Sequence, residues 1–81
     1  MQVLYFAWLK ERVGTSSEHV TTSATTARAL IAELIARSDG HVAAFSDLSA
    51  IRVAVNQQMV DLDASIEGAQ EVAFFPPVTG G

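Results

Sequence analysis

The chain of 81 residues contains no cysteine. This absence excludes a disulfide framework, a thiol nucleophile, a cysteine-ligated zinc site and an iron–sulfur cluster. Basic residues are also few, because five scattered Lys and Arg side chains stand against nine acidic ones, for a formal net charge of −4. Nucleic-acid binding needs a clustered basic surface. We therefore expect no nucleic-acid partner.

Long apolar runs and metal-ligand patterns are missing too, and we expect no leader. The longest apolar run, residues 3–9, is far too short to span a bilayer, and no basic segment with a cleavage-type sequence opens the chain. We therefore expect a cytoplasmic protein with no membrane partner. His19 and His41 show no metal-ligand spacing with the carboxylates, so we expect surface histidines and no metal site. Ser38, Asp39 and His41 are only sequence neighbours in a turn that ends a helix, which argues against a nucleophilic triad.

The chain does contain many apolar residues, which make up 49% of the sequence, and this content excludes a disordered chain. Their spacing predicts one domain of strand, strand, helix, strand, short strand and strand. The expected strands cover residues 3–9, 18–22, 51–56, 59–60 and 71–75, and the expected helix covers residues 25–38. Residues 41–50 are expected to be irregular, with one turn around residues 43–47. A single helix can cover only one face of a mixed sheet, so the fold class is α+β with one face of the sheet free of helices.

The helix is the clearest element, because its apolar residues follow helical spacing and form one stripe. The stripe consists of Ala27, Leu30, Ile31, Leu34 and Ile35. Thr25 or Thr26 is expected to cap its start, and Asp39-Gly40 to end it. Glu33 and Arg37 are spaced as a favourable i,i+4 ion pair.

The last strand leads directly into Pro76-Pro77-Val78-Thr79-Gly80-Gly81. Proline fixes φ near −65° and favours an extended residue before it, whereas glycine has no Cβ and lets another protein approach closely. We expect a domain over residues 1–76 and an extended tail over residues 77–81. The four residues after Pro77 span about 13 Å when extended, which is enough to bury a terminal carboxylate inside a partner.

This ending, Phe-Phe-Pro-Pro-Val-Thr-Gly-Gly within residues 71–81, closely resembles the C-terminus of the small subunit of molybdopterin synthase. Residues 3–7, residues 10–14 and the Ala-Val-Asn-Gln segment at residues 54–57 also match that family. The order of elements is similar to the β-grasp, or ubiquitin-like, fold. The resemblance covers the whole chain, and its most specific part is the ending.

The resemblance implies a sulfur carrier that uses its C-terminus as the reactive group. An adenylyltransferase similar to ubiquitin-activating enzymes would use ATP to adenylate the carboxylate of Gly81. A sulfurtransferase or cysteine desulfurase system would then convert it to a thiocarboxylate, a covalent 1-thioglycine, with no cofactor bound by the carrier itself. Residues Pro77, Val78, Thr79 and Gly80 would enter the large subunit, which carries the active site. There the sulfur would attack cyclic pyranopterin monophosphate, and two deliveries would form the dithiolene of molybdopterin within a heterotetramer.

Four further residues are candidates for contact with the large subunit. Phe75 lies on the outward side of the last strand by alternation, and Phe6 and Met59 are expected beside it on the helix-free face. The alternative for Phe75 is a core position, if the alternation is misassigned. Lys10 falls where the family usually has a basic residue, and the alternative there is a solvated loop charge.

Two other functions stay open on the sequence alone. A related carrier for thiazole synthesis or tRNA thiolation would share the fold and the Gly-Gly ending, but is not expected to carry the Phe-Phe-Pro-Pro-Val segment. A ubiquitin-like modifier would form an isopeptide bond to lysine, and a pure binding module would keep its activity after loss of Gly81.

Overall fold

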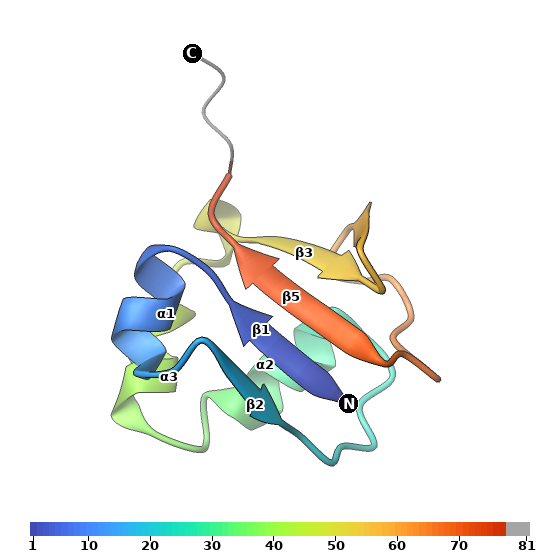
Figure 1. The fold of residues 1–81 in the computed structure, drawn as a ribbon, viewed down its shortest axis with the longest axis horizontal. Helices are drawn as coiled ribbons and strands as arrows, with labels where there is room; N and C mark the ends of the chain where they lie inside the picture. Colours follow the sequence, from blue (N-terminus) through green and yellow to red (C-terminus); the bar gives the residue numbers. More distant parts are fainter. Residues whose placement is uncertain (78–81) are drawn as a thin grey trace.

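A computed structural model describes residues 1–77 of the chain, which fold into a five-stranded mixed sheet with helices against it (Figure 1). In chain order the elements are β1 (Gln2–Tyr5), α1 (Trp8–Val13), β2 (Ser17–His19), α2 (Ala27–Leu34), α3 (Asp39–Ala44), the 3-10 helix η1 (Leu48–Ala50), β3 (Arg52–Val55), β4 (Gln58–Val60) and β5 (Glu71–Phe75). The sheet order is β2-β1-β5-β3-β4. The predicted α+β class and β-grasp fold are confirmed, with each of the five strands found within two residues of its expected start.

The centre of the sheet is the parallel pair β1 and β5, flanked by antiparallel neighbours on both sides. Figure 1 shows α2 crossing behind these central strands and the chain leaving the sheet beyond the end of β5. Alternate residues of the strands point toward α2 and form the core. Val3 and Tyr5 of β1 pair with Val72 and Phe74 of β5, and all four side chains are buried.

The expected strand over residues 3–9 is wrong in its second half. β1 ends at Tyr5, and after Ala7, which has φ +54°, the chain enters α1. The helical spacing puts Leu9 into the core and brings the Arg12 guanidinium 4.5 Å from the centre of the Trp8 ring. A continuous apolar run concealed this change, because a short buried strand and a short buried helix look alike in composition.

The expected helix over residues 25–38 is instead two helices. Thr26 caps α2 as predicted, accepting a hydrogen bond from the Ala29 N–H at 3.1 Å. However, α2 ends at Leu34, which leaves Ile35 39% exposed and outside the core stripe. The expected Glu33–Arg37 pair is also wrong, since Glu33 accepts a hydrogen bond from Thr22 and Arg37 pairs with a different carboxylate.

Gly40 does not end a helix but lies inside α3, against α1. A Cβ built on Gly40 would lie 2.4 Å from the backbone oxygen of Arg12. Only glycine allows the two helices to approach this closely. The segment that we expected to be irregular therefore contains α3 and η1, and α3 packs on the first helix.

Candidate functional site: the helix-free face and the end of β5

The face of the sheet opposite α2 carries an exposed apolar surface, which we call the helix-free face. The strand registers define it, because paired residues on neighbouring strands point to the same side. Leu4 pairs with Ala73, Ala73 with Ala54, and Ala54 with Met59. Phe75 lies two residues beyond Ala73 on β5, so it points to this side as the alternation predicted.

The sequence-derived contact residues reach this face in two groups. Phe6, 49% exposed, and half-buried Phe75 line one hollow of about 570 Å³ together with Leu4, Ala54, Ala73 and Pro76. Met59, 64% exposed, lies on the edge strand β4 and borders a separate groove with Arg52. The exposed apolar side chains thus extend across the sheet from β1 to β4.

Lys10 lies at the border of the same region, although not in a loop. It is exposed on α1 and lines a groove that also contains Phe6 and Ser17. The fold therefore brings Lys10 beside Phe6, with its ammonium available to an acidic group. Its expected role as a partner contact stays a prediction.

The candidate tail begins where the hollow ends. β5 stops at Phe75, half-buried Pro76 lines the hollow, and Pro77 follows. The expected tail residues Val78, Thr79, Gly80 and Gly81 lie outside the described residues. A partner that receives the end of the chain would have to approach beside the helix-free face.

Sequence reasoning did not name Leu4, Ala54, Ala73 or Pro76 as contact residues. The alternation that directs Phe75 outward also places Ala73 on the same side, and the alternation over residues 51–55 leaves Ala54 there. Only Phe6, Met59, Phe75 and Lys10 were selected as candidate contacts.

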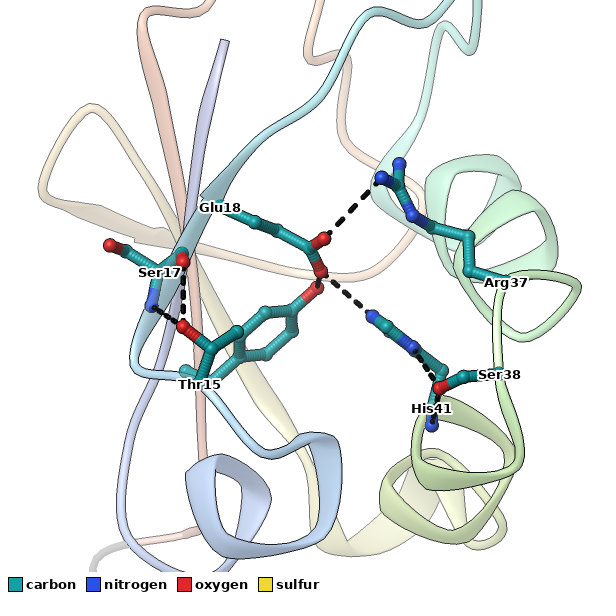
Figure 2. A network of polar contacts seen from close by, with 7 residues as sticks. Thr15, Ser17, Glu18, Arg37, Ser38 and His41 are labelled. Carbon is teal, nitrogen blue, oxygen red and sulfur yellow. Dashed lines mark hydrogen bonds and ion pairs between the residues drawn. The ribbon is translucent and has the colours of Figure 1, made fainter.

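A polar cluster between β1, β2 and α3 shows that the expectation of a surface His41 is wrong. His41 is 6% exposed, and its Nε2 lies 2.7 Å from Oε2 of Glu18. The same oxygen accepts a hydrogen bond from the Tyr5 hydroxyl at 2.6 Å. Figure 2 shows the Glu18 carboxylate between His41 and Arg37. The Nη2 of Arg37 lies 3.5 Å from Oε1 of Glu18. His19, by contrast, is exposed as expected.

The geometry of this cluster assigns its protons. A carboxylate can only accept, so His41 Nε2–H donates to Glu18. On the other side of the ring, the Ser38 Oγ lies 2.7 Å from Nδ1 and also accepts from the His41 backbone N–H at 3.1 Å, as the N-cap of α3. Ser38 is thus engaged in capping, and the acid that pairs with His41 is Glu18 rather than Asp39. The cluster joins four segments of the fold and supports a structural role.

The pKa values of two groups in this cluster are shifted by its contacts. Burial and the hydrogen bond to Glu18 raise the pKa of Tyr5 above its ordinary value. Burial alone would raise the pKa of Glu18, but the hydrogen bonds from Tyr5 and His41 and the charge of Arg37 outweigh it and lower that pKa. Both shifts favour a protonated phenol beside an ionised carboxylate.

Metal-ligand groups and membrane-spanning helices are both absent from the described residues. Within residues 1–77, no group of three or more His, Asp or Glu side chains is placed to hold a metal ion. In the same part of the chain, no helix has the length and apolar content needed to cross a bilayer.

Comparisons with known proteins relate the whole chain to small carrier proteins. The model of the ThiS family matches residues 3–81. The molybdopterin synthase sulfur carrier subunit of Escherichia coli is 42% identical over 81 residues, which cover 100% of this chain and 99% of that protein. The protein of the same name from Haemophilus influenzae is 33% identical over the same shares of both chains. The crystal structure of small archaeal modifier protein 1 from Haloferax volcanii is 26% identical, covers 100% of this chain and 98% of that one, and has a TM-score of 0.77.

Proposed function

Because this chain belongs to the ThiS family, we propose that it is the sulfur carrier subunit of a molybdopterin synthase. The observation that carries the proposal is the 42% identity to the carrier subunit of Escherichia coli over the full length of both chains. Two features of the chain support it. A carrier without cysteine cannot hold sulfur as a persulfide, and the C-terminal carboxylate follows an exposed apolar face that a large subunit would cover.

In the proposed cycle, an adenylyltransferase uses ATP to activate the carboxylate of Gly81. Activation is needed because a carboxylate is a poor electrophile until it carries a good leaving group. A sulfurtransferase or cysteine desulfurase system then supplies sulfur, AMP leaves, and the chain ends in a thiocarboxylate. Glycine at this position gives the least steric hindrance to attack at the acyl carbon.

The charged carrier then delivers its sulfur inside the large subunit. Pro77, Val78, Thr79 and Gly80 are the proposed inserted segment. The large subunit would supply the pterin site and the acid–base groups, and cyclic pyranopterin monophosphate would receive the sulfur on the way to the dithiolene. The carrier would leave as a carboxylate.

The proposed docking surface uses the residues that the fold brings to the helix-free face. Phe6, Phe75 and Met59 would contribute apolar area, and Lys10 would pair with an acidic group at the border. The exposure of Phe6, Met59 and Lys10, together with the hollow between Phe6 and half-buried Phe75, supports this assignment. A face of this kind, apolar at its centre and charged at its border, is typical of a protein interface.

Deletion of Gly81 tests the proposal directly. The variant should make no molybdopterin with the large subunit, the activating enzyme and a sulfur donor, because the reactive carboxylate would sit on the wrong residue. A variant extended by one glycine after Gly81 should fail for the same reason. Glu67→Gln, a change at an exposed position that does not line the hollow, should act like the wild type. Molybdopterin formation by the deletion variant would contradict the tail mechanism.

A second candidate function is that of a ubiquitin-like protein modifier. The observation that favours it is the TM-score of 0.77 to small archaeal modifier protein 1. A modifier would end in an isopeptide bond between Gly81 and a lysine of another protein. The two functions differ in the product at Gly81, since a carrier gains sulfur and a modifier gains a substrate protein.

A further inference from the structure

The centre of the helix-free face is a trough whose floor is formed by two alanines. Leu4, Ala73, Ala54 and Met59 lie in one row across four strands, so that two small side chains stand between two large ones. Ala73 is only 6% exposed and Ala54 only 9%, although no helix of residues 1–77 covers this side of the sheet. Phe6 and Phe75 line the same hollow as these two alanines.

The two ends of the trough carry opposite charges. Arg52 of β3 pairs with Phe75 and borders the neighbouring groove with Met59, so it stands beside the trough at the end where the tail starts. Glu71 lines the hollow at the other end of β5, about 13 Å away at the usual rise per residue. Among the described residues neither side chain forms an ion pair. The Arg52 guanidinium is nevertheless held in place, because its Nη1 donates to the carbonyl oxygens of Ser49 at 3.2 Å and Ile51 at 3.0 Å.

We propose that the trough seats one bulky apolar side chain of the large subunit over Ala54 and Ala73, and that the segment bearing this side chain places an acidic group against Arg52. The inference rests on the proposed function and deepens it. The hollow and the start of the tail share Pro76, so a subunit that receives the tail must also lie over the trough. The unpaired charge of Arg52 at the near end selects an acidic group there, and Glu71 at the far end disfavours one.

The alanines determine the size of the side chain that fits. Ala54→Leu and Ala73→Leu would each fill the trough from below without entering the core, because both side chains point away from α2. We expect each variant to bind the large subunit at least about tenfold more weakly than the wild type. The matched control is Ala32→Leu, the same change on an exposed position of α2, which should leave the dissociation constant within about twofold.

The acidic group is tested by charge reversal and by salt. Arg52→Glu should weaken binding by about tenfold or more and should flatten its dependence on salt concentration, since an attraction across the interface is replaced by repulsion. Arg52→Lys keeps the charge and should retain most of the affinity. Arg28→Glu is the control, because Arg28 belongs to α2 on the other side of the sheet and already pairs with Asp63 at 2.8 Å.

Binding is measured by calorimetry with the isolated large subunit, and the thermal unfolding midpoint of each variant is recorded in parallel. If Ala73→Leu proves unstable, Ala54→Leu tests the same floor from the neighbouring strand. If the wild type binds and a folded leucine variant binds with the same affinity, no large side chain is seated over Ala54 and Ala73. If the binding of Arg52→Glu and of the wild type depends equally on salt concentration, no acidic group lies against Arg52. Failure of the wild type itself to bind would instead contradict the proposed function.

Discussion

Replacement of Glu18 by glutamine is the sharpest test of the buried polar cluster. In the wild type, Glu18 Oε2 accepts two hydrogen bonds, from Tyr5 at 2.6 Å and from His41 at 2.7 Å. Glutamine can keep its carbonyl oxygen at this position, so both bonds survive but lose the negative charge. A hydrogen bond to a charged group contributes about 1.5–3 kcal/mol and a neutral one about 1 kcal/mol. The contribution of Arg37 is small, because its Nη2 is 3.5 Å away and its side chain is half exposed.

We therefore expect Glu18→Gln to lower the free energy of unfolding by about 2 kcal/mol at pH 7. A domain of this size typically has a total stability of about 4–12 kcal/mol, so the loss is substantial. The corresponding fall in the thermal midpoint is about 8–16 °C.

The difference between the two proteins should depend on pH in a defined direction. The pKa of Glu18 is lowered in the folded state from its ordinary value of 4.5. A lowered carboxyl pKa gives stability that is fully present above the unfolded-state value and is lost as pH falls through the folded-state value. The difference should therefore be largest at neutral pH and should shrink below pH 4.5, because a protonated Glu18 is as neutral as glutamine.

Urea unfolding of both proteins between pH 7 and pH 3 measures this difference. Glu67→Gln is the matched control, since Glu67 is exposed and should show almost no change in stability at any pH. A stability difference between wild type and Glu18→Gln that stays constant over this pH range would refute the reasoning.

Three other substitutions test separate parts of the account. Phe75→Ala should weaken binding to the large subunit by about tenfold or more while changing the thermal midpoint little, and a large loss of stability with unchanged binding would place Phe75 in the core. Gly40→Ala should lower the free energy of unfolding by about 2 kcal/mol, because the added Cβ would meet the backbone oxygen of α1, and urea unfolding measures this. Asn56→Ala should lower the free energy of unfolding by about 2 kcal/mol in the same assay, because the Asn56 Oδ1 accepts hydrogen bonds from the backbone N–H groups of Gln70 and Glu71 at 3.0 and 3.1 Å.

The strands could be predicted from the sequence because each carries a local pattern. The alternation over residues 71–75 gave the bounds of β5 and the outward direction of Phe75, and the alternation from Ile51 onward located β3. The polar residues 56–58 also marked the turn before β4, where Asn56 and Gln57 adopt positive φ.

The helices at one end of the sheet could not be predicted in this way, because their positions depend on contacts distant in the sequence. The chain forms a helix around Leu9 because this places the Leu9 side chain in the core. Glycine is required at residue 40 because the backbone of α1 lies too close for a Cβ. The burial of His41 has the same origin, because its partner Glu18 lies 23 residues away on β2. No local pattern distinguishes such a histidine from an exposed one.

The central proposal, that sulfur is carried on Gly81, is tested most directly by the intact mass of the protein. The chain is incubated with its activating enzyme, ATP and a sulfur donor, and the mass of the product is compared with that of the starting protein. We predict a gain equal to the replacement of one oxygen by sulfur, located at Gly81 by fragmentation. An unchanged mass, with an activating enzyme that is competent on another carrier, would contradict the proposal.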